Sequence, residues 1–168
     1  WKTCTDLLRH AIPHAEEQNL GGGLVIGLEE LSDKLLEIGK YSEAEELISR
    51  ALTESSKFGK DKGYARLLGK LVFCRTEQPD SDISSADDDL DEAEEIWIRY
   101  GLKRDLLDNI SVKVKLHIAR SEYVEAEDEI SRGMNLFERR FYPRGHWKFM
   151  DRCSRYLLNC PNEKMNSR

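Results

Sequence analysis

The sequence contains few of the residues that break helices or cross-link a small secreted fold. Only 4 prolines and 11 glycines occur in 168 residues, which leaves long stretches free to form helices. The cysteines, Cys4, Cys74, Cys153 and Cys160, include no Cys-x-x-Cys pair and are too few for a disulfide scaffold of this length. We therefore expect reduced thiols and a cytoplasmic protein.

Long apolar segments are also missing. The longest apolar run, residues 24–28, is far shorter than the roughly 20 residues that cross a bilayer. No signal peptide opens the chain, so we expect no association with a membrane. Because the chain starts at Trp1 rather than at a methionine, we expect it to be a piece of a larger protein.

The residues of common catalytic and metal sites are scattered. The histidines lie at 10, 14, 117 and 146, without the spacing of a zinc site, and no serine stands in a nucleophile elbow. We therefore predict neither an enzyme nor a bound cofactor or metal. The net charge of −6 favours solubility and argues against nucleic-acid binding by the chain as a whole.

What the sequence does contain is a recurring segment. "YSEAEELISR", "LDEAEEIWIR" and "YVEAEDEISR" share an E-A-E core centred on Ala44, Ala93 and Ala126. The spacings are 49 and 33 residues. The shorter one matches a helix-pair repeat of roughly 34 residues, and the longer one predicts an insertion.

Apolar residues at helical spacing predict an all-α fold. At Pro13 we expect a kink or a break of the first helix, and the glycines at 21–23 are expected to form the turn that ends it. The expected elements are a preceding helix in 1–20, three antiparallel helix pairs in 24–141 with an acidic insertion at 79–89, a closing helix in 144–160 and a frayed tail at 161–168.

The first copy resembles the tetratricopeptide repeat, especially its kinesin-light-chain-like version. Gly39, Tyr41 and Ala44 follow that pattern, whereas Lys113 and Ser121 of the third copy depart from it. The resemblance implies an α-solenoid, a right-handed superhelix of helix pairs that binds other proteins on its concave side. The matching residues are Leu28, Leu31, Leu35, Gly39, Tyr41, Ala44, Ile48 and Ala51 in the first copy; Ala65, Leu68, Gly69, Val72, Ala93 and Trp97 in the second; and Ile110, Tyr123, Ala126, Ile130 and Gly133 in the third.

The beginning of the chain resembles the junction before the tetratricopeptide sensor of NB-ARC and NACHT innate-immune receptors. Trp1, Cys4, Leu8 and the "IPHA" of residues 12–15 correspond to that junction. The resemblance implies a sensor or scaffold segment of a larger receptor. The chain has no phosphate-binding loop, so an NTPase activity would belong to another part of such a receptor.

The resemblance also implies a binding groove lined by the first helix of each pair, where an acidic strip suits a protein or peptide partner with basic residues. Glu29 and Asp33 stand where the family's carboxylate clamp needs positive charge, so we do not expect that ligand. A solvated helix face remains the alternative for the strip. The implied groove residues are Glu29, Glu30, Asp33, Glu37, Arg66, Lys70, Phe73 and Lys115, with Ile26 beside the strip.

A second hypothesis concerns the basic, aromatic stretch "ERRFYPRGHWKFMDRCSRY". Interleaved cations and aromatic rings can neutralise and stack single-stranded nucleic acid. The residues that would do so are Arg139, Arg140, Arg144, Lys148 and Trp147. The alternative is that the aromatic residues close the core and the cations meet acidic surfaces, including those of a second copy, so self-association is a third hypothesis.

The acidic insertion allows two further interpretations. Ser84 and Ser85 precede three aspartates, as acid-directed kinases prefer. Acidic residues alternate as in a calcium loop, but Ser85 stands where that loop needs glycine and Asp91 where it needs glutamate. We favour an acidic linker.

Overall fold

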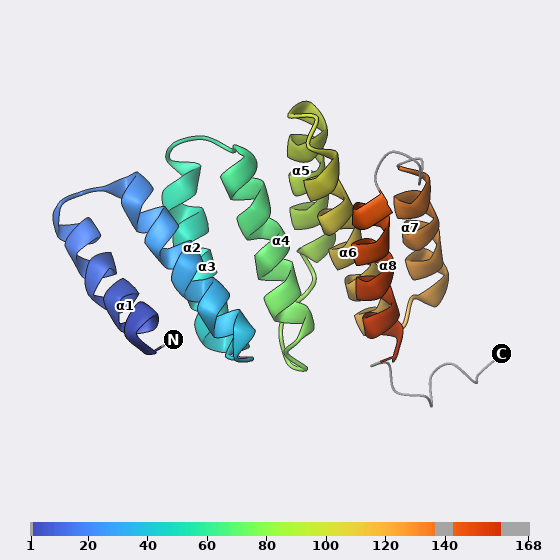
Figure 1. Cartoon of the computed structure of the whole chain (residues 1–168), viewed down its shortest axis with the longest axis horizontal. Coiled ribbons are helices and arrows are strands. Elements are labelled where there is room, and N and C mark those ends of the chain that lie inside the picture. The colour runs from blue at the N-terminus through green and yellow to red at the C-terminus, as the bar shows by residue number, and fades with distance from the viewer. Residues whose placement is uncertain (1, 137–142, 159–168) are drawn as a thin grey trace. The chain divides into compact units, whose positions relative to one another are not determined.

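A computed structural model describes residues 2–136 and 143–158, and within these ranges the chain forms eight α-helices and no strand (Figure 1). The prediction of an all-α fold is confirmed, and the succession of helices is compatible with an α-solenoid of helix pairs. The handedness of a superhelix stays a prediction. The helices are α1 (Lys2–Glu17), α2 (Gly21–Glu37), α3 (Tyr41–Ser56), α4 (Lys62–Thr76), α5 (Ala86–Arg99), α6 (Lys103–Arg120), α7 (Tyr123–Asn135) and α8 (Pro143–Leu158).

The chain divides into two compact units, a first unit of Trp1–Ser85 and a second unit of Ala86–Arg168. In the first unit, α2 packs against α1 and α3, and α3 packs against α4. In the second unit, α6 packs against α5, α7 and α8. The helices expected to form the middle pair, α4 and α5, therefore belong to different units.

Four of the connections share one short turn of two or three residues. Each contains a residue of positive φ, and the N–H of the residue after it donates to the carbonyl five positions earlier, which satisfies the end of the helix. The next helix then begins at once. The positive-φ residues are Asn19, Gly39, Gly101 and Ser121, with φ of 54°, 73°, 66° and 66°, and the donated hydrogen bonds are Leu20–Ala15 (2.9 Å), Lys40–Leu35 (2.9 Å), Leu102–Trp97 (3.0 Å) and Glu122–His117 (2.8 Å).

One local expectation for α1 is wrong. The three glycines do not form the turn but the first turn of α2, because Asn19, whose side chain tolerates the left-handed region, ends α1 two residues earlier. Of the kink or break expected at Pro13, the break does not occur, because the helix continues through this residue. Pro13 lies on the exposed side of α1, where water can satisfy the carbonyl of Arg9 that loses its donor.

The turns reveal an internal repeat of 82 residues. Asn19 and Gly101 are 82 residues apart, and so are Gly39 and Ser121. The starts of α2 and α6, and of α3 and α7, are separated by the same distance in the sequence. The two units therefore share one order of helices and turns.

This repeat changes the interpretation of the E-A-E segments. Ala44 and Ala126 are both the fourth residue of their helices, α3 and α7, whereas Ala93 is the eighth residue of α5. The helices α2, α4 and α6 begin at positions 21, 62 and 103, which gives a period of 41 residues. The spacings of 49 and 33 residues arise because the middle copy lies about one helical turn deeper in its helix, and α5 begins at Ala86, within the expected insertion.

Small residues bring α2 and α3 close together in the core of the first unit. Ala44 and Ala51 are fully buried, and an alanine at a helix crossing lets the two axes approach. The buried cluster consists of Ile12, Leu24, Leu28, Leu31, Leu35, Ala44, Ile48, Ala51, Leu67, Leu71 and Cys74. Burial raises the pKa of the Cys74 thiol to about 12 and that of Cys153 to about 11, so both stay protonated at neutral pH.

A glycine permits the docking of α8 in the second unit. Gly133 of α7 is buried, and a methyl group added there would overlap the ring of Phe149, at 2.8 Å from its Cε1 atom. Phe149 itself is only 3% exposed. The aromatic side chain therefore packs directly on the backbone of α7.

We predict that Gly133→Ala destabilises the protein by about 1–3 kcal/mol, because the new methyl group overpacks the contact with Phe149. The urea midpoint of unfolding measures this. Gly22→Ala is the matched control, since a methyl group there meets no atom within 4 Å and should leave stability unchanged or raise it by up to about 1 kcal/mol. Equal midpoints for Gly133→Ala and wild type would contradict the prediction.

Candidate protein-binding surface

Acidic residues of α2 meet basic residues of α4 on the surface of the first unit. Both helices pack against α3, which brings their side chains within reach of each other. Glu29 accepts from the Nε of Arg66 at 2.7 Å and from the Nζ of Lys70 at 2.8 Å, and Lys70 also lies 2.7 Å from Asp33. The structure thus joins four residues that the sequence assigns to the groove.

These ion pairs change the electrostatics of the expected strip. The side chain of Glu29 is only 14% exposed and already holds two cations, so its charge is compensated within the unit. A basic partner would have to displace Arg66 or Lys70 to reach it. Exposed ion pairs of this kind contribute about 0–1 kcal/mol each, so such an exchange is energetically accessible at Asp33 and Arg66, whose side chains are 37% and 54% exposed.

Part of the strip is not used by these pairs. Besides Glu29, the strip on α2 contains Ile26, Glu30, Asp33 and Glu37, which follow one another at helical spacing. Of these four residues, only Asp33 takes part in these pairs with α4. Ile26 is 63% exposed, and no ion pair joins the exposed Glu30 to another residue of the described ranges. Glu37 is paired with Lys34 at 2.8 Å. An apolar and an acidic side chain therefore stand one turn apart on a surface that the fold does not cover.

The other two expected groove residues have separate surroundings. Phe73 is half-buried, and its ring meets Tyr41 edge to face, with centroids 6.4 Å apart. Lys115 belongs to the second unit, where its ammonium lies 5.1 Å from the ring centroid of Tyr156 on α8. Lys115 therefore belongs to a different unit from the strip.

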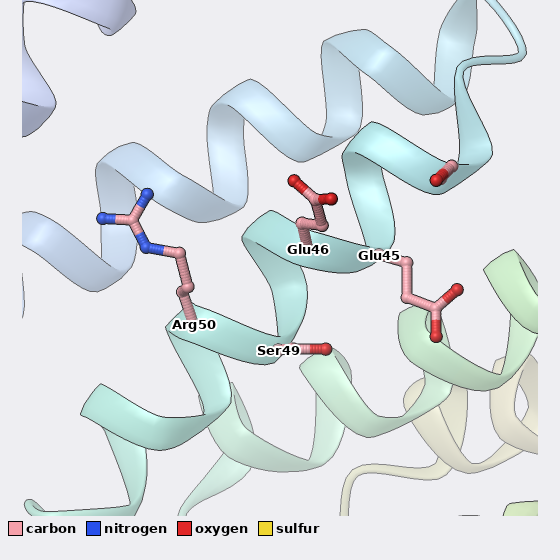
Figure 2. Close-up of a pocket in the computed structure, with 5 residues that line it drawn as sticks. Glu45, Glu46, Ser49 and Arg50 are labelled. Carbon is pink, nitrogen blue, oxygen red and sulfur yellow. The ribbon is translucent and has the colours of Figure 1, made fainter.

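An open polar hollow on α3, of about 520 Å³, was not foreseen from the sequence (Figure 2). Two of its charged residues hold neighbouring helices: Glu45 accepts from Arg75 at 2.9 Å, and Arg50 pairs with Glu16 of α1. The charges of Glu45 and Arg50 are therefore compensated within the fold. The lining residues are Ser42, Glu45, Glu46, Ser49 and Arg50.

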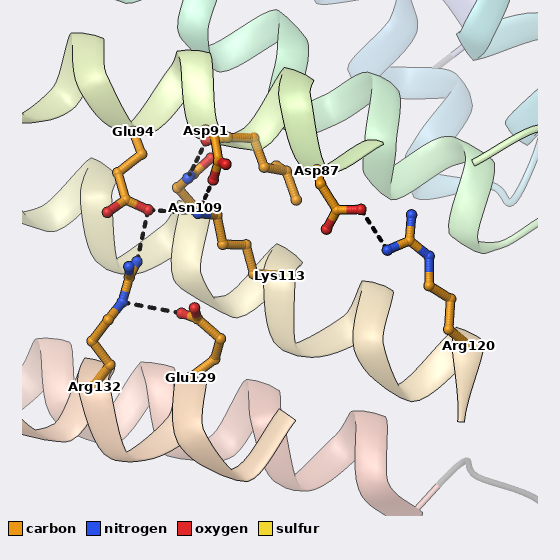
Figure 3. A network of polar contacts seen from close by, with 9 residues as sticks. Asp87, Asp91, Glu94, Asn109, Lys113, Arg120, Glu129 and Arg132 are labelled. Carbon is orange, nitrogen blue, oxygen red and sulfur yellow. Dashed lines mark hydrogen bonds and ion pairs between the residues drawn. The ribbon is translucent and has the colours of Figure 1, made fainter. Parts of the chain in front are cut away.

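The second unit is held together by a network of charges inside the helix packing (Figure 3). Lys113 of α6 is only 9% exposed and donates to Asp91 at 2.5 Å and to Glu94 at 2.7 Å, both on α5. Arg132 of α7 donates to the same Glu94 at 2.7 Å. One carboxylate thus joins three helices.

This network explains why Lys113 departs from the repeat pattern. Lys113 lies 82 residues after Leu31, a buried core residue of the first unit, so a cation occupies an apolar position of the repeat. Burial opposes ionisation of Glu94, but hydrogen bonds from Arg132 and Lys113 outweigh it and lower its pKa. Burial likewise acts against the charge of Lys113, yet the bonds to Asp91 and Glu94 raise its pKa. The sequence did contain a signal for this network, because a lysine stands at a core position of α6 and several acidic residues lie on the preceding helix, α5.

One member of the network is poorly compensated. Glu129 lies 3.1 Å from the Nε of Arg132, but neither its buried Oε2 nor that Nε has a hydrogen-bond partner within the described ranges. Burial raises the pKa of Glu129 above its ordinary value of 4.5, and the attraction of Arg132 and Lys113 only partly offsets this effect. The ionised Glu129 therefore costs stability at neutral pH.

We predict that Glu129→Gln is more stable than wild type at pH 7. A raised folded pKa contributes stability that is present below pH 4.5 and lost as the pH rises through the folded value, and glutamine does not titrate. The advantage of the variant in unfolding free energy should therefore grow from about pH 4 to pH 7 in urea titrations. Glu127→Gln, at an exposed position of α7, should show no such trend; a decreasing advantage for Glu129→Gln would contradict the prediction.

The residues of the nucleic-acid hypothesis lie on α8 or before it. Arg144, Trp147 and Lys148 are exposed, and Trp147 has 77% of its surface accessible. Arg139 and Arg140 lie outside the described residues. The other aromatic residues behave differently: Phe149 is buried against α7, so the expectation that aromatics close the core holds for Phe149 but not for Trp147.

Comparison with family models and with curated proteins gives no relative from which a role could be transferred. No protein-family model matches the chain, and no curated protein matches it either. Within the described ranges, no helix combines the length and apolarity needed to cross a bilayer. No cluster of three or more His, Cys, Asp or Glu side chains with the arrangement of a metal site occurs there.

Proposed function

We propose that the chain is a protein-binding module of the helical-repeat type, and that it docks a segment of another protein along the surface formed by α2 and α4. The observation that carries the proposal is the strip on α2. Ile26 and Glu30 are exposed one turn apart, beside ion pairs that can be exchanged. Buried leucines on the opposite side of the same helix hold the strip in place.

The strip also defines the chemistry of the partner. An aliphatic or aromatic side chain of the partner would cover Ile26, and a lysine or arginine one turn away would meet Glu30. A second cation of the partner would approach Asp33, which shares Lys70 with Glu29. The expected partner is therefore a short amphipathic segment with basic residues on one side.

The wider role follows from the resemblances in the sequence. The kinesin-light-chain-like features of the first copy support membership of the tetratricopeptide family, with a right-handed superhelix. The junction-like beginning supports a sensor or scaffold segment of a larger innate-immune receptor. Both belong to the proposal, as does a cytoplasmic location.

We predict that peptides selected from a random display library on the wild-type chain combine lysine or arginine with an apolar residue. Glu30→Lys should weaken binding of the strongest such peptide by at least about tenfold, because attraction is replaced by repulsion beside Asp33. Fluorescence polarisation with the labelled peptide measures the dissociation constant.

The control for this experiment is Glu46→Lys, which makes the same change of charge on α3, outside the strip. It should alter the affinity by no more than about twofold. If both variants weaken binding equally, the attraction comes from the net charge of the chain and the strip is not the site. Unchanged binding by Glu30→Lys would exclude the strip directly.

A further inference from the structure

The helix α8 has one buried and one exposed face. Gly145, Phe149 and Cys153 are buried at intervals of four residues. Arg152 also contributes to the inner side, because it donates to Asp108 at 2.9 Å and to the hydroxyl of Ser111 at 2.8 Å on α6. The outer face consists of Arg144, Trp147, Lys148, Asp151, Ser154, Arg155 and Leu158.

The internal repeat of 82 residues gives a sequence reference for this outer face, because it aligns α8 with α4, although α4 packs mainly on α3 and α8 packs mainly on α6. Both helices have a cation at the same inner position. Lys70 of α4 binds α2, and the aligned Arg152 of α8 binds α6. On the outer face, apolar residues of α4 become polar. Gly69, Val72 and Phe73 of α4 correspond to Asp151, Ser154 and Arg155 of α8.

Trp147 changes in the opposite direction. Its counterpart Ala65 is 1% exposed, whereas Trp147 replaces this small buried residue with the largest apolar side chain and is 77% exposed. By contrast, Trp97 is 4% exposed and belongs to the core. A face that gains polar residues is not built to receive another repeat helix, so helix packing does not account for the indole.

Two cations flank the indole and have no role within the described fold. Arg144 lies three residues before Trp147 and Lys148 one residue after it, so all three lie within about one turn of α8. No ion pair joins Arg144 or Lys148 to another residue that the structure describes. The acid on this face, Asp151, is held by Arg155 at 2.7 Å. The turn therefore presents two positive charges beside an exposed aromatic ring.

We propose that this turn of α8 binds single-stranded nucleic acid, with a base stacked on Trp147 and its flanking phosphates bound by Arg144 and Lys148. An exposed ring stacks on any base, and two cations within about one turn of the ring can bind the phosphates next to that base. A base inside a duplex is already stacked and cannot reach the ring. With a net charge of −6, the chain does not attract polyanions over its whole surface, so binding is confined to this turn.

An acidic protein segment is the other ligand that could bind this turn, and its chemistry differs from that of single-stranded nucleic acid in a testable way. Its carboxylates would pair with Arg144 and Lys148 as well as phosphates do, but they would not need the flat face of Trp147. The contribution of the indole therefore separates the two ligands. It also separates this site from the α2 strip, since the two surfaces share no residue.

The test is fluorescence anisotropy with a labelled oligo(dT) of about twelve nucleotides, within the site sizes of single-strand binders, and the full chain. We expect wild-type binding to weaken with salt at a logarithmic slope of about −1.4, as for two neutralised phosphates. Trp147→Ala should lower the affinity at least about tenfold, and Trp147→Phe should retain part of it. Arg144→Glu/Lys148→Glu should abolish binding.

The control is Arg9→Glu/Lys62→Glu, which makes the same change in net charge at exposed positions of the first unit and should bind within about twofold of wild type. Polyglutamate of equal charge should fail to displace the oligonucleotide. The proposal is overturned if the wild type does not bind oligo(dT), if Trp147→Ala binds as well as wild type, or if polyglutamate displaces the oligonucleotide at equal charge, which would assign the turn to acidic proteins.

Discussion

The short turn that contains one left-handed residue is the constraint on which the rest of the structure depends. It satisfies the carbonyls at the end of one helix and starts the next helix at once, so adjacent helices must run antiparallel. Its four occurrences place the starts of α2, α3, α6 and α7 and thereby the register of both units. The facing residues, such as Ala44 with its neighbours on α2, then meet without further adjustment. The surface strip of α2 and its ion pairs with α4 are consequences of this register.

The helices themselves were largely predictable, because leucines and alanines at helical spacing leave little choice. The turns were harder to predict from the sequence. Gly39 and Gly101 can be recognised as left-handed turn residues, but Asn19 and Ser121 have the same conformation without being glycine. The period was also obscured, since the E-A-E core of Ala93 sits deeper in its helix than those of Ala44 and Ala126. Ion pairs between α2 and α4 could not be foreseen, because residues far apart in the sequence meet only once both helices pack on α3.

The two units show that one order of helices and turns can carry two different kinds of core. The first unit has Leu31 in an apolar core, whereas the second has Lys113 at the corresponding position and surrounds it with carboxylates. A buried ion pair is weak support for stability, because the loss of hydration offsets the attraction. A buried ion pair requires more exact geometry than apolar packing does. Glu94 has this geometry, because it accepts from Lys113 of α6 and from Arg132 of α7 and so joins α5, α6 and α7. The incomplete pairing of Glu129 shows that the attraction between these charges does not offset the cost of burial at every residue of the network.

The short turns also bear on the speed of folding. Most of the packing within each unit is between helices that follow one another in the chain, and a connection of two or three residues costs little loop-closure entropy. Proteins with such local contacts have low contact order and fold in microseconds to milliseconds. The pair α2 and α3 in the first unit and the pair α6 and α7 in the second can therefore each nucleate before the remainder of the chain is ordered. Repetition of one turn gives the chain several equivalent starting points for folding instead of a single obligatory nucleus.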